Sequence, residues 1–123
     1  MLLKNPVTFL ATTDPARARV FYVDVVGLPF LRDDGFALVF DNVGVPLRVS
    51  RVENFQPLPH TVLGWDVADI VRAVATLTAR GAVFQRYSFL PQDEAGIWGA
   101  PGGARVAWFV DPDGNVLSLT QAA

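Results

Sequence analysis

Few side chains in this sequence are of the types that do chemistry near neutral pH. There is no cysteine, and the single histidine, His60, ends a proline-rich stretch. Thiolate catalysis and zinc–thiolate sites are therefore excluded, and a lone histidine without a GxSxG motif argues against a Ser-His-Asp triad. We expect His60 to be a solvated side chain, with a place in a binding cleft as the alternative.

A second group of candidates lies in the segment FLPQDEAGIWGAPGG at 89–103: Gln92, Asp93, Glu94 and Trp98. An acid here could act as a general base if burial raised its pKa, but a loop that reads QDE is also typical of a solvated turn. We expect Glu94 to be solvated. Trp98 has glycines close on both sides, and an exposed tryptophan on such a loop favours a lid over a cleft or a dimer contact. No lysine or helix signal follows the glycines, so a phosphate loop is not indicated.

The elements that must position these residues form two matched halves. A helix is predicted from Asp14-Pro15, an acidic N-cap with proline at the first position, to Gly27. A second helix is predicted from Asp69 to Gly81, again with apolar residues three and four positions apart. Each helix follows one β-rich run and precedes three, so both halves read β-α-β-β-β. The predicted strands are Val7–Thr12, Phe30–Leu31, Phe36–Phe40 and Leu47–Val52, then Thr61–Val67, Val83–Tyr87, Val106–Val110 and Val116–Leu119.

The turns repeat as well: Asp41–Leu47 (DNVGVPL) matches Asp111–Leu117 (DPDGNVL), with Asp, Gly and Leu in step. Asp and Gly favour a tight turn between strands, because one position needs a positive φ. The second half is about 15 residues longer, and the insertion is best placed at 89–103, which we interpret as a functional loop. One domain is expected, with a first module at about 1–52, a linker at 53–60 and a second module at about 61–123.

Composition excludes several classes of protein. The 123 residues are 51% hydrophobic and 18% charged, which suits a packed core and is too apolar for a disordered tail. A net charge of -2 with scattered basic residues provides no footprint for nucleic acid. The N-terminus shows no signal-peptide pattern, and no apolar run approaches the roughly 20 residues that span a bilayer. We expect a soluble cytoplasmic protein without nucleic-acid or membrane partners.

With this organisation, the sequence resembles the vicinal oxygen chelate superfamily of glyoxalases, extradiol dioxygenases and bleomycin resistance proteins. The resemblance rests on TTDPARARVFYVDVVGL at 12–28, DVADIVRAVATLTARGAVF at 66–84 and WFVDPDGNVLSLTQ at 108–121, which cover most of the chain in the right order. It implies an α+β fold in which two tandem β-α-β-β-β modules form a curved, mixed eight-stranded sheet around a cleft, with the helices on the convex side. The fold hosts several reactions and, in some members, binding alone.

In metal-binding members of this superfamily, the ligands come from the first and last strands of each module. The corresponding positions here are Val7 and Arg48 in the first module, and Val62 and Ser118 in the second. Metal-dependent members typically carry glutamate where Ser118 stands. A divalent ion in such a site needs imidazole nitrogens or carboxylate oxygens, and none of these four side chains supplies one. We therefore expect no metal site and no cofactor.

Strand alternation indicates which side chains face the implied cleft, because residues two apart share a face. The cleft wall is mostly apolar and aromatic, with one cation and a few hydroxyls, which is typical of a small-molecule pocket. The alternate residues, among them Leu10, Leu47 and Leu117, are expected in the core under the helices. The predicted cleft-facing residues are Val7, Phe9, Arg48, Ser50, Val62, Gly64, Asp66, Trp108, Ser118 and Thr120.

Arg48 is the one cation among these residues. A guanidinium in a partly desolvated cleft needs a partner. One interpretation is an internal ion pair with Asp66 or Asp93, and the other is recognition of a carboxylate or other anion on a ligand. Both hold if a ligand shares or displaces the internal partner. Tyr87 either belongs to the wall of the cleft or only ends its strand.

Two classes of function remain. We favour a metal-free protein that binds an apolar or aromatic ligand, with or without an anionic group, in the cleft between the modules. Binding requires only a complementary shape, whereas catalysis requires a positioned acid, base or metal. The alternative is a lyase, isomerase or dioxygenase-type enzyme that is metal-independent or uses an unusual metal set. The mean hydropathy of +0.32 is high for so small a monomer, which indicates that some apolar surface lines a cavity or a subunit interface. We expect a homodimer, because two-fold association would cover the concave face of the implied sheet. The ligand-binding candidates are Arg48, Phe9, Trp98, Trp108, Gln92, Asp93, Ser118 and His60.

Overall fold

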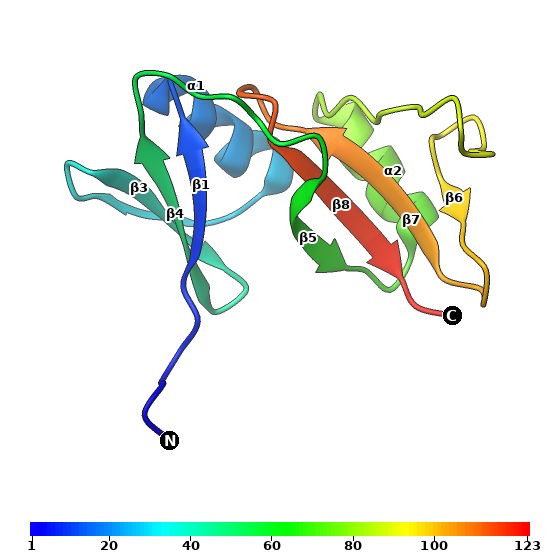
Figure 1. Cartoon of the computed structure of the whole chain (residues 1–123), viewed down its shortest axis with the longest axis horizontal. Helices are drawn as coiled ribbons and strands as arrows, with labels where there is room; N and C mark the ends of the chain where they lie inside the picture. Colours follow the sequence, from blue (N-terminus) through cyan, green and yellow to red (C-terminus); the bar gives the residue numbers. More distant parts are fainter. The chain divides into compact units, whose positions relative to one another are not determined.

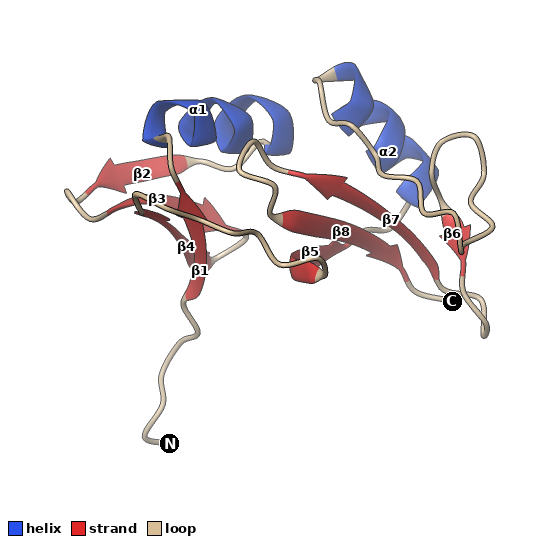
Figure 2. Cartoon of the chain, turned by 45° about the horizontal axis from the view of Figure 1, so that its top comes forward, coloured by secondary structure: helices blue, strands red, loops and turns tan.

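The computed structural model describes residues 1–123, which divide into two compact units, Met1–Gln56 and Pro57–Ala123. Each unit contains one four-stranded mixed sheet and one helical segment that covers a face of that sheet (Figures 1 and 2). The predicted α+β class and the two β-α-β-β-β-like modules are therefore confirmed. Whether the two sheets join into one curved sheet around a cleft depends on the placement of the units and stays a prediction.

The first unit is built around a sheet with the strand order β1-β4-β3-β2. The edge strand β1 runs parallel to β4, and the other pairs are antiparallel. A short bulge interrupts the pairing of β2 with β3. The elements are β1 (Thr8–Thr12), α1 (Pro15–Val20), η1 (Phe21–Val26), β2 (Phe30–Asp33), β3 (Ala37–Asn42) and β4 (Val45–Arg51).

The first helix begins and ends where its sequence signals lie. The Asp14 carboxylate accepts a hydrogen bond from the Arg17 backbone N–H at 3.1 Å, and Pro15 occupies the first turn. The last turns widen into the π-helical segment η1, in which the N–H of Gly27 reaches back to the Tyr22 carbonyl. Gly27 has a φ of 90°, which is the left-handed conformation that ends a helix.

The second unit repeats this plan with the strand order β5-β8-β7-β6. Its edge strand β5 runs parallel to β8, and the other pairs are antiparallel. The Asp69 carboxylate caps α2 by accepting from the Arg72 N–H at 3.1 Å, and the Gln121 side chain accepts from the Ile70 N–H at 2.8 Å. The elements are β5 (Thr61–Asp66), α2 (Ile70–Ala79), β6 (Trp98–Gly99), β7 (Arg105–Val110) and β8 (Val116–Gln121).

One predicted strand is wrong. The segment 83–87 forms no strand; Phe84 makes a single bridge to Phe109, and the Gln85 N–H donates to the Trp108 carbonyl at 2.7 Å. The fourth strand of the sheet is β6, which lies inside the segment 89–103 that was expected to be a loop. The chain thus leaves the edge of β7 after two residues and returns to it at Trp98, because the intervening segment makes its own hydrogen bonds.

The core of each unit lies between its helix and its sheet. The predicted core residues Leu47, Val49, Leu117 and Leu119 are all buried. Burial alternates along β4, whereas β8 is buried at four successive residues, Val116 to Leu119. In the first unit, the buried Tyr22 ring packs against Phe40 at a centroid distance of 5.6 Å. Because one face of each sheet is buried, the register of its strands is fixed, and so are the positions of the side chains on the other face.

The DPDGN turn is a hydrogen-bonded unit in its own right. Asp111 is buried, and its carboxylate accepts from the backbone N–H of Asp113 and of Asn115 and from the Asn115 amide. Gly114 has a φ of 88° and lies so close to Pro57 that a Cβ there would stand 2.9 Å from the proline ring. The motif therefore forms the turn and also packs against Pro57, the first residue of the second unit.

No helix in this structure combines the length and the apolar character that crossing a membrane requires.

Candidate functional site

A cavity of about 230 Å³ lies in the second unit, on the side of its sheet that faces away from α2. Trp108 establishes this side: it pairs with Ser118 in β8, whereas the next residue, Phe109, points into the core. Strands β5, β7 and β8 supply Thr61, Trp108 and Val116. The full lining is Pro59, His60, Thr61, Tyr87, Phe89, Leu90, Trp108 and Val116.

Aromatic rings define one wall of this cavity. The Tyr87 ring stands perpendicular to Trp108, with centroids 5.5 Å apart, and packs against Phe89 at 5.6 Å. Edge-to-face packing holds ring positions by electrostatics as well as by area. Phe89 is 78% exposed, so its outer face remains accessible to a ligand. The wall therefore offers flat π surfaces of fixed orientation.

Tyr87 adds a polar group to this wall. Burial raises the pKa of its phenol, because the phenolate loses solvation. The hydroxyl is therefore protonated at neutral pH and can donate a hydrogen bond to a ligand. Tyr87 is a wall residue, which resolves the two interpretations that its position in the sequence allowed.

Of the eight predicted ligand-binding residues, His60 and Trp108 line this cavity. His60 is exposed at its rim, where the linker turns into β5. Trp98 does not line the cavity but contacts a residue that does: its ring centroid lies 6.1 Å from that of Trp108, and its backbone pairs with Val106. Trp98 is half-buried and belongs to a strand, which differs from the exposed lid that its glycine neighbours indicated; a dimer contact, the other expectation for Trp98, stays a prediction.

Gln92 and Asp93 use their side chains on the backbone of their own loop. The Gln92 amide bonds to three backbone groups, and one Asp93 carboxylate oxygen accepts from the N–H of Ala95 and of Ile97. Such a turn organises the loop, so the general-base hypothesis for Asp93 has no support in this geometry. Glu94 is exposed, as expected for a solvated acid.

Ser118 is buried, with 9% of its surface exposed, and lies beside Gly64 in the parallel pair of β5 and β8. A Cβ on Gly64 would stand 2.5 Å from the Ser118 Oγ. Only glycine therefore allows the hydroxyl to occupy its present place.

In the first unit, Phe9 is 64% exposed and lies next to Arg48 in the β1–β4 pair. The alternation that placed both on the face away from the helix is confirmed, because the intervening Leu10 and Val49 are buried. Both residues belong to the first unit, whereas the cavity described above is formed within the second unit. Their part in ligand binding stays a prediction.

Arg48 has an internal partner, but a different one from those expected. Its Nη2 lies 2.7 Å from an Asp34 carboxylate oxygen, and the side chains are 26% and 29% exposed. Asp34 lies on the turn between β2 and β3, in the same unit and beside β4. The expected pairs with Asp66 or Asp93 would join the two units and stay predictions. No sequence pattern connects that turn to Arg48.

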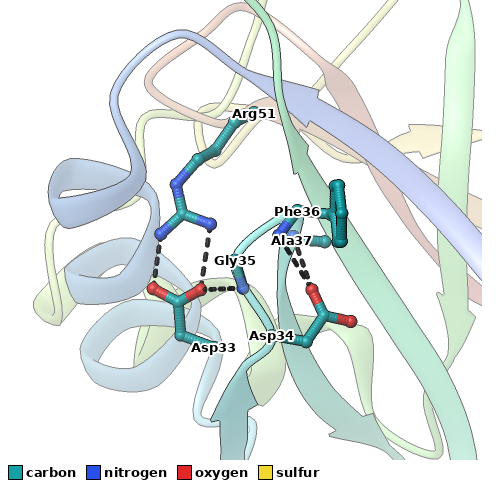
Figure 3. Close-up of polar contacts among 6 residues, drawn as sticks. All are labelled: Asp33, Asp34, Gly35, Phe36, Ala37 and Arg51. Atoms are coloured by element: carbon teal, nitrogen blue, oxygen red, sulfur yellow. Dashed lines mark hydrogen bonds and ion pairs between the residues drawn. The ribbon is translucent and has the colours of Figure 1, made fainter.

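The turn that carries Asp34 is rich in fixed charge (Figure 3). The other oxygen of Asp34 accepts from the N–H of Phe36 at 3.0 Å and of Ala37 at 2.9 Å. These bonds and that from Arg48 lower the pKa of Asp34 to about 2. Its neighbour Asp33 forms a bidentate salt bridge with Arg51, which lowers the pKa of Asp33 as well.

The four positions at which the resemblance implies metal ligands do not suit a metal here. Val7 and Val62 are hydrocarbons with 44% and 37% exposure, Arg48 is a cation paired with Asp34, and Ser118 offers one buried hydroxyl. Elsewhere, no three His, Cys, Asp or Glu side chains gather closely enough to share an ion. The donor set does not fit a divalent metal.

Several lining residues were missed from the sequence. Pro59, Phe89 and Leu90 belong to segments without regular structure, so strand alternation says nothing of their direction. The aromatic pair at 87 and 89, just after a β-rich run, was the one signal that could have indicated a wall.

Solved structures similar to this chain carry one fold over its whole length. A glyoxalase/bleomycin resistance protein/dioxygenase superfamily member from Sphaerobacter thermophilus matches with a TM-score of 0.73 and 21% identity, over 98% of each chain. TioX from Micromonospora sp. ML1 matches with 0.72 and 23% identity, over 98% of this chain and 99% of its own. The fosfomycin resistance protein FosX from Listeria monocytogenes matches with 0.76 and 13% identity, over 100% and 96%.

No family model matches the sequence, and no curated protein is significantly similar to it. The structural matches show that the chain has the fold of the glyoxalase/bleomycin resistance protein/dioxygenase superfamily, as its motifs predicted.

Proposed function

We propose that this protein binds a small, mainly apolar aromatic molecule without the help of a metal ion, through the cavity of its second unit. The observation that carries the proposal is the aromatic wall of that cavity: Tyr87 at right angles to Trp108, with Phe89 beside them. Such a wall, with a phenol and an imidazole at its edge, is typical of sites where a few polar groups orient an apolar ligand.

The size of the cavity restricts the ligand. An apolar cavity of about 150 Å³ holds one benzene ring, and sites for drug-sized molecules are roughly 300 to 1,000 Å³. A volume of about 230 Å³ therefore suits one or two fused rings, either as a whole molecule or as the buried part of a larger one. The Tyr87 hydroxyl favours a ring that carries a hydrogen-bond acceptor.

The chemistry of the surrounding side chains supports binding over catalysis. The residues that line the cavity include no carboxylate, and the acids of the nearby loop are exposed or bonded to its backbone. Similar structures include a protein named for resistance to the antibiotic fosfomycin, and several named for a superfamily that includes bleomycin resistance proteins. A small-molecule ligand is consistent with both kinds of name.

The test is a binding assay with planar fragments. Quinoline, 2-naphthol and indole are offered to the protein, with cyclohexanol as the non-aromatic control, and contact is detected by saturation-transfer NMR and quenching of tryptophan fluorescence. We expect at least one planar fragment to bind and cyclohexanol to bind much more weakly.

The variant Trp108→Ala should lose about 1.5 to 3 kcal/mol of that binding, the range for burying a large apolar side chain. A matched control is Trp65→Phe, which changes a tryptophan on the opposite, core-facing side of the sheet, where it stacks on Phe109. Absence of binding by every fragment, or binding that Trp108→Ala leaves intact, would contradict the proposal.

A further inference from the structure

The aromatic wall of the cavity stands on a segment that contains no helix and no strand. Tyr87, Phe89 and Leu90 lie between the bridge at Phe84 and strand β6. A segment of this kind normally samples several conformations, and a wall that must first be ordered binds its ligand more weakly. Something in the structure must therefore hold these residues in place if the cavity exists before the ligand arrives.

The Gln92 side chain makes three hydrogen bonds that span this segment. Its Nε2 donates to the carbonyl of Gln85 at 2.9 Å and to that of Gly96 at 2.8 Å. Its Oε1 accepts from the backbone N–H of Tyr87 at 2.7 Å. One half-buried amide thus links the beginning of the segment, the first wall residue and the return toward β6.

Backbone bonds also join this segment, since the Leu90 N–H donates to the Tyr87 carbonyl at 3.0 Å and the Gln92 N–H to the Leu90 carbonyl at 3.1 Å. The other side chains that bond to the turn around Gln92 do not reach the wall. The Arg86 guanidinium donates to the carbonyls of Gln92, Asp93 and Glu94, at 3.2, 2.8 and 3.3 Å. The Asp93 carboxylate accepts from two N–H groups of the same turn. Both side chains are exposed. Gln92 alone among them contacts the backbone of a residue that lines the cavity.

We propose that Gln92 is a positioning residue for the aromatic wall: its amide holds the Tyr87 backbone, so that the wall is formed before a ligand binds. The positioning of the wall is inferred from the three hydrogen bonds alone. The expected effect on ligand affinity rests in addition on the proposed function. The partly buried bonds of Gln92 are worth more than exposed ones, because water competes less for the same groups. The segment is therefore a fixed wall rather than a lid that closes over the ligand.

Two substitutions test the role of the amide. Gln92→Leu keeps a side chain of similar size and removes all three hydrogen bonds. Gln92→Glu keeps the acceptor for the Tyr87 N–H but, when ionised, cannot donate to the Gln85 and Gly96 carbonyls. Protonation of that glutamate restores one donor, so the variant should recover as the pH falls through the ordinary glutamate pKa of about 4.3 and below.

The matched control is Gln85→Leu. It removes a side-chain amide whose hydrogen bond, to the Val83 carbonyl at 3.1 Å, lies outside the loop, and it leaves the backbone carbonyl that Gln92 uses.

Amide hydrogen exchange of Tyr87 in the ligand-free protein is the first measurement. We expect exchange at least about tenfold faster in Gln92→Leu, with no change in Gln85→Leu, because the loss of one bonded partner exposes the N–H to solvent by local opening. In Gln92→Glu, the protection of Tyr87 relative to the wild type should rise as the pH is lowered. Unchanged exchange in both Gln92 variants would overturn the proposal.

Quinoline affinity is the second measurement. We expect about tenfold weaker binding by Gln92→Leu and wild-type binding by Gln85→Leu. The ratio of the Gln92→Glu affinity to the wild-type affinity should rise at low pH, and His60 cancels in this ratio because it is present in both proteins. Equal affinity in the wild type and Gln92→Leu would overturn the proposal. If neither the wild type nor a variant binds any planar fragment, the proposed function fails, while the Tyr87 exchange still decides whether Gln92 positions the wall.

Discussion

The contact between Gly64 and Ser118 leads to a prediction whose size follows from the structure. Gly64 has no special backbone conformation, so alanine at this position is strained only by what its Cβ meets. That Cβ would stand 2.5 Å from the Ser118 Oγ and 3.3 Å from the Ser118 carbonyl oxygen. Ordinary contacts of these atoms are roughly 3.5 Å. The hydroxyl must therefore move by about 1 Å or the two strands must separate.

Two opposing effects determine the cost of Gly64→Ala. Gly64 itself is exposed, but Ser118, which its Cβ would meet, is buried between β5 and β7, and overpacking of a buried side chain costs about 1 to 3 kcal/mol. Replacing glycine by alanine returns about 0.4 to 1 kcal/mol, because the unfolded chain has fewer conformations to lose. We expect a net decrease of about 0.5 to 2 kcal/mol in the free energy of unfolding.

A double-mutant cycle measures the contact directly. Urea unfolding is followed by circular dichroism for Gly64→Ala, Ser118→Ala and the double variant. Without the Oγ, the next contacts of the Cβ are the Ser118 carbonyl at 3.3 Å and the Ser118 Cβ at 3.8 Å, so Gly64→Ala should be near neutral in the Ser118→Ala background. The coupling energy should be about 1 kcal/mol, within the usual range for touching residues.

Gly99→Ala serves as the matched control. Gly99 also lies in a strand, and a Cβ there would meet nothing within 4 Å. We expect this substitution to be neutral or slightly stabilising. The reasoning is refuted if Gly64→Ala is as stable as the wild type, or if it costs as much with alanine at 118 as with serine.

Four further predictions concern charge, metal and assembly. The pKa of Asp34 is about 2 in the folded protein and 3.8 in the unfolded chain, so its carboxylate stabilises the fold above pH 4 and this stability is lost as the pH falls toward 2. In Asp34→Asn, the free energy of unfolding should therefore fall less steeply between pH 4 and pH 2. Arg48→Ala should lower the melting temperature slightly and leave quinoline affinity unchanged, because Arg48 pairs with Asp34 inside the first unit, whereas the proposed quinoline site is formed by residues of the second. Loss of affinity for quinoline-2-carboxylate alone would instead favour an anion anchor. Elemental analysis after dialysis should find no stoichiometric transition metal, since Val7, Val62, Arg48 and Ser118 are not ligands, and about one metal per chain would contradict this. Light scattering at micromolar concentration should give the mass of a homodimer, because exposed apolar side chains such as Phe9 and Phe36 would then be covered; a single-chain mass would refute it.

The sequence by itself determined the parts of the fold whose causes are local. Asp14 and Asp69 cap the helices through the N–H group three residues on, and glycine with a positive φ ends the first helix at Gly27. Alternation then separates the core face from the opposite face on β4 and β7, and it places Trp108 on the side of the cavity. These signals depend on neighbours in the chain, so they can be read without a fold.

The tertiary structure alone decided the features that join distant or irregular segments. The partner of Arg48 proved to be Asp34, because β3 and β4 bring the preceding turn beside it. The fourth strand of the second sheet is Trp98–Gly99 and not the predicted segment 83–87. The chain between them is held by hydrogen bonds of the Gln92 side chain, which an alternating pattern of apolar residues cannot predict. A side-chain amide that bonds to three backbone groups produces no periodic pattern in a sequence. Its partners depend on which segments the fold brings beside it, and only the tertiary structure decides that.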